Sequence, residues 1–118
     1  MTTTRFSTTY EPGAVVLVPF KFADGEATKK RPAVVLSVEA YHASRLDTVI
    51  VALTTNTRDS YYGDCNLNDW RAAGLPKPTK AKGVIQTMER QMIERRLGTL
   101  SAADLNSVKQ SLRDILGL

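Results

Sequence analysis

The stretch TKKRPAVVLS, from Thr28 to Ser37, places three cations and a proline directly before an unbroken apolar run. A short run rich in β-branched side chains is typical of a strand that is buried on both faces. A buried strand has no structural need for positively charged residues at its start, so Lys29, Lys30 and Arg31 are candidates for binding an anion. The plainer alternative is that they are solvated cations at a strand end.

Other segments of the chain have the same character. Strands are predicted for GAVVLVPF, PAVVLSV and DTVIVALTT, and a weaker one for YYGDCNL, at residues 13–20, 32–38, 47–55 and 61–67. The connections between them are brief, and no long helical pattern separates them. This spacing favours a small β-barrel over a βαβ fold.

The second half of the chain mixes short elements. DWRAAGLPKP, residues 69–78, predicts one or two helical turns that Asp69 caps and Gly74 ends, with two prolines preventing continuation. TKAKGVIQTM (79–88) predicts extended chain, and MIERRLGTL (92–100) fits either a strand or a helix.

A helix is expected at the C-terminus. Ser101 and Asp104 are spaced as in a capping box, although Asp is shorter than the usual Glu or Gln. An apolar stripe at helical spacing follows and is expected to pack on the barrel: Leu105, Val108, Leu112, Ile115 and Leu116.

Length and composition favour a single cytoplasmic domain. The chain has 118 residues, 42% of them hydrophobic, which suits one core. Residues 1–10 are polar and predict a flexible tail, not a signal peptide, and no apolar run is long enough to cross a membrane. Cys65 is the one cysteine, so no intramolecular disulfide is possible. The net charge of +4 weakly favours a polyanionic partner.

The sequence lacks the residues that most common catalytic mechanisms require. The chain has one histidine, His42, which follows EAY and is interpreted as a solvated side chain in a surface loop. With Cys65 it is too little for a transition-metal site of the usual kind, so no metal or cofactor is predicted. There is also no Walker loop, dinucleotide glycine pattern or GxSxG motif.

What remains is a cationic strand start and a hydroxyl-rich strand end. Thr54, Thr55 and Asn56 close the strand that follows the Arg31 strand. If the two strands pair antiparallel, Arg31 and Thr54 lie at the same edge of the sheet. A guanidinium binds phosphate through two parallel donors, and a hydroxyl adds a third. RNA cleavage by its own 2′-hydroxyl needs no metal, and Arg31 suits the stabilisation of the phosphorane charge but not the role of general base.

The ordered motifs resemble the MazF/PemK toxins of type II toxin–antitoxin systems, especially the PemK-like branch. The matching text includes PGAVVLVPFKFADG, KKRPAVVLS, VIVALTT and, in the tail, QTMERQMIERRLGTLS, and it spans nearly everything from Glu11 onward. The resemblance implies a mainly β fold, an SH3-like small barrel with a C-terminal α-helix, that forms a homodimer. It also implies a metal-independent endoribonuclease that cuts single-stranded RNA to a 2′,3′-cyclic phosphate and a 5′-hydroxyl, and a cognate antitoxin protein that blocks the RNA groove.

The family's catalytic arginine and threonine fall on Arg31 and Thr54. Some members also carry an Arg-x-Asp pair where this chain has Ala81 and Gly83, and Glu89 stands at the Asp position of the later family motif. The general base is therefore open among Asp24, Glu26 and a water near Thr54. The residues expected to contact RNA are Lys29, Lys30, Thr55, Asn56, Lys80 and Lys82.

Two other functions fit the same fold. A gyrase-binding toxin like CcdB shares it without cutting RNA, and the retained Arg31 and Thr54 argue against this alternative. A non-catalytic module that binds RNA or an antitoxin is favoured by the missing Arg-x-Asp pair. The loop from 21 to 30 is interpreted either as a flap over RNA or as a flexible hairpin, and Trp70 is expected to belong to the core.

Overall fold

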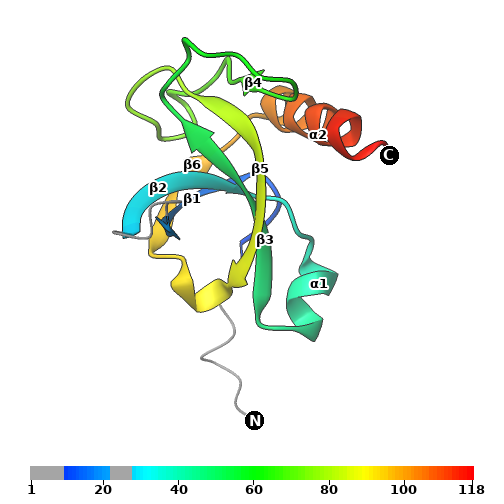
Figure 1. Ribbon diagram of the computed structural model, residues 1–118. Helices are drawn as coiled ribbons and strands as arrows, with labels where there is room; N and C mark the ends of the chain where they lie inside the picture. The colour runs from blue at the N-terminus through cyan, green and yellow to red at the C-terminus, as the bar shows by residue number, and fades with distance from the viewer. Residues whose placement is uncertain (1–9, 22–27) are drawn as a thin grey trace.

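One curled antiparallel sheet forms the body of the protein (Figure 1). The computed structural model describes residues 10–21 and 28–118. Within these residues six strands lie in the order β4-β5-β3-β2-β1-β6. Their bounds are Ala14–Lys21 (β1), Thr28–Val35 (β2), Asp47–Thr54 (β3), Cys65–Asn66 (β4), Lys80–Glu89 (β5) and Arg95–Thr99 (β6). The prediction of a mainly β, barrel-like fold is confirmed.

The three apolar runs are central strands because both of their faces are covered. On one face, β-branched side chains of β1, β2 and β3 pack with the segment 65–75 and with the helix α2 (Ala102–Leu116). On the other face, β-branched side chains of the same strands pack with Ile93 and Tyr10. The first set is Val15, Val34 and Val51, and the second is Val16, Val35 and Ile50. A strand buried on both faces gains stability from every side chain, which explains unbroken apolar runs in place of alternation.

The C-terminal helix begins as predicted, but its acidic residue has another role. The hydroxyl of Ser101 caps α2 by accepting from the backbone N–H of Asp104 at 3.1 Å. The buried Asp104 carboxylate accepts instead from the backbone N–H groups of Asn68 and Asp69, at 3.0 and 2.8 Å. The short side chain of Asp104 therefore connects the turn at 68–69 to the helix. The prediction that Asp104 completes a capping box with Ser101 is wrong.

The short elements between the strands take simple forms. Residues 70–74 form hydrogen-bonded turns that end at Gly74, where φ is +84°, and Trp70 packs against the core as expected. The weak strand shrinks to the two residues of β4, and the ambiguous segment resolves into a 3-10 turn η2 (Arg90–Met92) followed by β6.

The interpretation of His42 as a solvated loop residue is wrong. Residues Glu39–Ser44 form a short helix, α1, and His42 is 3% exposed beneath it. Its Nε2 lies 2.6 Å from the Ser37 hydroxyl, and the guanidinium of Arg90 donates to its backbone carbonyl at 2.6 Å. Six residues are too few to show a helical apolar stripe, so the sequence carried no signal that this turn packs on β3.

Burial of His42 predicts that acid destabilises the fold. Burial lowers the pKa of His42, and the nearby Arg90 charge lowers it further, against a smaller opposing effect of Glu39. The folded imidazole therefore takes up its proton at a lower pH than the unfolded one, which titrates near pH 6.5, so stability falls as the pH drops through about 6.5, by up to about 1.4 kcal/mol per pH unit. Urea unfolding at pH 8 and pH 5.5 measures this loss.

The chain offers a clean control because it has one histidine. His42→Gln removes the titrating ring and keeps a polar amide, so its stability is lower but flat over that pH range. Equal pH slopes for the wild type and His42→Gln contradict the prediction.

Candidate anion-binding site

A pocket opens where the pairing of β2 with β3 stops. The two strands pair antiparallel from Val35 with Ile50 to Ala33 with Ala52. The same register continued would place Pro32 against Leu53 and Arg31 against Thr54, but Pro32 has no N–H for this ladder. These four residues line a cavity of about 590 Å³ instead. The antiparallel pairing that was expected to bring Arg31 and Thr54 to one edge is confirmed.

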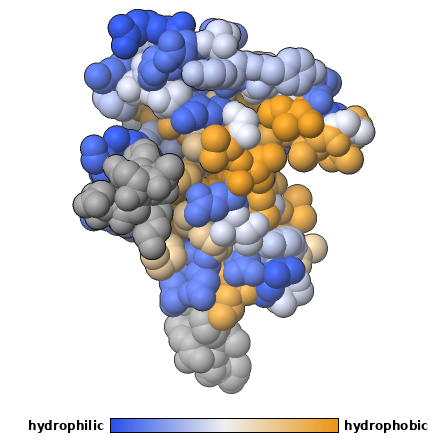
Figure 2. All heavy atoms as spheres, in the orientation of Figure 1, coloured by the Kyte–Doolittle hydropathy of each residue, from blue (hydrophilic) through white to orange (hydrophobic). Residues whose placement is uncertain are grey.

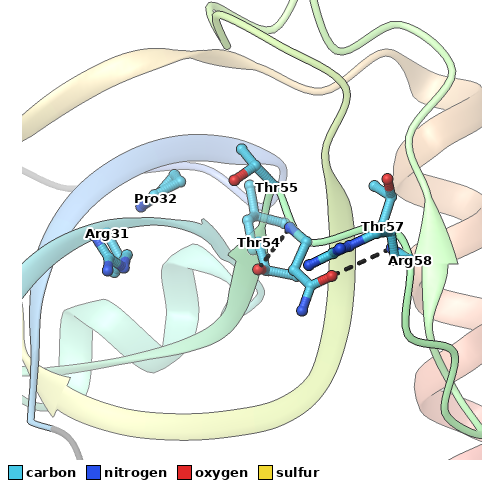
Figure 3. A pocket seen from close by; sticks show the side chains of 8 residues that line it. Arg31, Pro32, Thr54, Thr55, Thr57 and Arg58 are labelled. Atoms are coloured by element: carbon cyan, nitrogen blue, oxygen red, sulfur yellow. Dashed lines mark hydrogen bonds between the residues drawn. The ribbon is translucent and has the colours of Figure 1, made fainter.

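The lining of this cavity, here called the Arg31 pocket, is rich in hydrogen-bond donors. It comprises Arg31, Pro32, Leu53, Thr54, Thr55, Asn56, Thr57 and Arg58. Among these described lining residues there are two guanidiniums and three hydroxyls, and none carries a carboxylate. In Figure 3 Arg31 and Pro32 form one side and the segment after β3 forms the other. Such a lining favours a phosphate or another anion.

Thr54 is held so that its hydroxyl proton is available to a ligand. Its Oγ1 accepts the backbone N–H of Asn56 at 3.1 Å (Figure 3). Because this hydrogen bond uses the oxygen as an acceptor, the hydroxyl proton remains to donate. Thr54 is therefore suited to donate to an anionic oxygen in the pocket.

The side chain of Asn56 is committed to the loop. Its Oδ1 accepts from the backbone N–H of Arg58 and its Nδ2 donates to the Asp59 carboxylate, each at 3.2 Å. Asn56 thus shapes the wall that presents Thr55 and Arg58. One amide proton is left for RNA, so direct RNA contact by Asn56 stays a prediction.

The cations at the start of β2 are exposed and face solvent near the pocket. Arg31 is exposed, and a nitrogen of its guanidinium donates to the Lys30 carbonyl at 3.4 Å. The ammonium of Lys30 lies 2.5 Å from the Glu94 carboxylate. Lys29 is exposed, and neither lysine lines the Arg31 pocket.

Lys80 departs most from its expected role. It is 4% exposed, its ammonium lies 2.7 Å from the Asp64 carboxylate, and it also donates to the backbone carbonyl of Asp59. Burial raises the pKa of Asp64, but its hydrogen bonds to Lys80 and to the Tyr61 N–H outweigh this and hold the pKa below its ordinary value. A buried, paired ammonium has little surface to offer RNA, so direct RNA contact by Lys80 is not expected. Lys82 is exposed on β5, outside the pocket lining.

Sequence reasoning missed Arg58. It sits in a polar loop, NTRDS, with no periodic pattern, and its one available signal was its closeness to the threonines that end β3. Of the proposed bases, Asp24 and Glu26 lie outside the described residues. No group of three His, Cys, Asp or Glu side chains that could hold a metal ion occurs in the part of the chain that the structure describes. Over the same residues, no helix is long and apolar enough to cross a membrane.

Comparison with solved structures shows that this architecture recurs. An endoribonuclease from a mycobacterial species, solved in complex with its cognate antitoxin, is 22% identical over 93% of this chain and 97% of its own, with a TM-score of 0.76. MazF from Deinococcus radiodurans is 22% identical over 95% and 100%, with a TM-score of 0.75. A MazE–MazF structure from the same organism is 20% identical over 94% and 99%, also with a TM-score of 0.75.

Sequence comparison reaches the same family. Comparison with curated proteins gave no match. The family model of the PemK-like, MazF-like toxins matches residues 11–116, which is nearly the whole chain. The chain therefore belongs to the PemK-like, MazF-like toxins of type II toxin–antitoxin systems.

Proposed function

We propose that this toxin is a sequence-specific endoribonuclease that cleaves single-stranded RNA, including mRNA, at the Arg31 pocket. The observation that carries the proposal is that Arg31 and Thr54 line one open cavity where the pairing of β2 with β3 stops. Solved structures of the same fold are described as endoribonucleases, which supports the same activity here.

The proposed reaction is an internal transesterification of RNA. The 2′-hydroxyl loses its proton to a base and attacks the adjacent phosphorus, the bond to the 5′-oxygen breaks, and that oxygen gains a proton. The products are a 2′,3′-cyclic phosphate and a 5′-hydroxyl. Charge accumulates on the phosphoryl oxygens, and the proposed role of the Arg31 guanidinium and the Thr54 hydroxyl, which line the same cavity, is to stabilise it.

No metal takes part in this proposal, because two guanidiniums already supply positive charge to the pocket. The base is not among the described lining residues, which hold no carboxylate or imidazole. Water next to the Thr54 hydroxyl, Asp24 and Glu26 remain the candidate bases, and the last two precede β2 in the sequence.

We further propose a homodimer, as the family resemblance implies, with its contact on the apolar face of β5 and α2. Figure 2 shows apolar residues gathered where these elements meet, and Val84, Ile85 and Leu116 are 44%, 37% and 55% exposed. Light scattering should give twice the mass of one chain, and Ile85→Asp should shift it to one chain. Leu46→Asp, at a similarly exposed leucine before β3, is the matched control and should stay dimeric. A wild-type monomer contradicts the proposal.

The partner that regulates this toxin is proposed to be a cognate antitoxin. The mycobacterial relative and the Deinococcus MazF were both solved with an antitoxin bound. An acidic or extended antitoxin segment that covers the Arg31 pocket would exclude RNA by occupying the same donors.

The direct test is to incubate the purified protein with a long, unstructured RNA in EDTA and map the new ends. Discrete cuts that end in a cyclic phosphate support the proposal and give the cleaved motif. A 2′-O-methyl copy of the same RNA is the control, and it should stay intact because its nucleophile is blocked. Intact unmodified RNA would overturn the proposal; RNA binding would then indicate the non-catalytic module, and inhibition of supercoiling the gyrase poison.

A further inference from the structure

The wall of the Arg31 pocket opposite Arg31 carries a second arginine, Arg58. It is exposed, it lines the same cavity, and in Figure 3 its side chain reaches from the loop back toward Thr54. Among the residues that the structure describes, no carboxylate lies within ion-pair distance of its guanidinium. A guanidinium without a carboxylate partner, in a pocket lined with hydroxyls, is chemically suited to bind a phosphate.

The loop that carries Arg58 is anchored by contacts with Lys80 of β5. Residues 55–64 join β3 to β4 and contain no strand or helix. The buried ammonium of Lys80 donates to the backbone carbonyl of Asp59, the residue after Arg58, and pairs with the Asp64 carboxylate at the end of the loop. The same carboxylate accepts from the Tyr61 backbone N–H at 3.0 Å.

Burying the Lys80–Asp64 ion pair costs desolvation free energy. Side-chain exposures of 5% for Lys80 and 10% for Asp64 mean that both charges have left water. A buried ion pair contributes little net stability compared with apolar residues of the same size, and in some proteins such a pair fixes one geometry instead. Here the geometry that it fixes is that of the loop carrying Arg58.

We propose that Arg58 is a second phosphate contact of the toxin's RNA site and that the buried Lys80–Asp64 pair is its positioning device. With Arg31 on one side and Arg58 on the other, the pocket binds the strand backbone from two sides. Lys80 thus acts on RNA through the loop, without touching it. The inference rests on the proposed RNA-cleaving function and adds residues to that site.

The test measures binding apart from cleavage. Fluorescence anisotropy with a short, mixed-sequence 2′-O-methyl RNA gives the Kd of each variant over a range of KCl concentrations. Arg58→Ala should weaken binding about tenfold, as expected for one lost charged hydrogen bond. It should also reduce the slope of log K against log salt by about 0.7, the value for one phosphate contact on a single strand. Arg58→Lys should restore the slope and part of the affinity.

The positioning role is tested with Lys80→Met/Asp64→Asn. This pair of substitutions leaves the net charge unchanged, since one removes a positive and the other a negative charge. It should weaken binding as much as Arg58→Ala does, and adding Arg58→Ala to it should change nothing more. Two effects that multiply would show that the pair acts on binding independently of Arg58, and either that result or no effect would overturn the positioning role.

Controls separate these effects from general charge and from unfolding. Arg45→Ala and Lys109→Met each remove an exposed cation outside the pocket, and both should bind as the wild type does. Each variant is melted first. If Lys80→Met/Asp64→Asn does not fold, Lys80→Gln/Asp64→Asn replaces it, because two amides occupy the same buried positions without a charge, and the same non-additivity is expected.

Failure of this inference is distinguishable from failure of the proposed function. Wild-type protein that cuts RNA while Arg58→Ala binds like Arg45→Ala overturns the second contact alone. Protein that binds through Arg58 but never cuts overturns the catalytic proposal and supports the contact. Protein that neither binds nor cuts overturns both.

Discussion

Arg31→Ala is expected to lower the rate of RNA cleavage by at least about 10³-fold, the range measured for arginines that stabilise a phosphoryl transition state. The loss falls on kcat more than on KM, because the guanidinium gains most of its interaction as charge builds on the phosphoryl oxygens. The Arg31 side chain is exposed on β2, so the variant should fold normally. End-mapped cleavage of a fluorescent RNA under single-turnover conditions measures the rate.

Two variants sharpen this test. Arg31→Lys keeps the charge but loses the fork of parallel donors, so its rate should lie between those of the wild type and the alanine variant. Arg45→Ala removes an exposed arginine at the opposite end of β3, where it pairs with Asp47, and should cleave as the wild type does. A rate for Arg31→Ala within tenfold of wild type would exclude Arg31 from catalysis.

The sequence was sufficient to predict Arg31 and Thr54 as neighbours because strand pairing is a regular rule. Unbroken valine-rich runs indicated strands, and a short connection implied an antiparallel pair, so a residue before one strand and a residue ending the next had to meet. The register Ala33 with Ala52, continued by two residues, places Arg31 opposite Thr54. Thr55, which follows Thr54 at the end of the strand, lines the same cavity.

The features that escaped prediction depend on contacts between distant segments. Whether Lys80 is solvated or buried depends on Asp64, which the fold of the 55–64 loop brings beneath it. The burial of His42 depends in the same way on Ser37 and Thr48, which lie on either side of α1 in the chain. Local patterns carry no record of such pairs, and a charged or polar residue is by default expected at the surface.

The tail motif RRLGTLS contains a glycine whose role is visible in the packing. Gly98 of β6 lies against the turn that ends the 69–74 segment, and a Cβ built on it would stand 2.5 Å from the carbonyl carbon of Ala73. The contact is mutual, since a Cβ on Gly74 would stand 2.7 Å from the carbonyl carbon of Leu97. Two backbones therefore touch here with no room for a methyl group between them.

Gly98→Ala is accordingly expected to destabilise the fold by about 3 kcal/mol or more, at the upper end of the cost of overpacking, because backbone atoms and not a flexible side chain must move. In a domain of this size the melting temperature should fall by roughly 10 °C or more. Differential scanning calorimetry measures both. Position 98 has no positive φ, so the effect comes from space alone.

Two other glycines separate space from backbone strain. Gly117 has a φ of +70° but no atom within 4 Å of a built Cβ, so Gly117→Ala pays for strain alone, about 1 kcal/mol. Gly74 combines a φ of +84° with the overlap, so Gly74→Ala should be the least stable of the three. If Gly98→Ala and Gly117→Ala have the same melting temperature, the turn can move away from β6 at little cost. The close packing of the two backbones is then not the reason for the glycine.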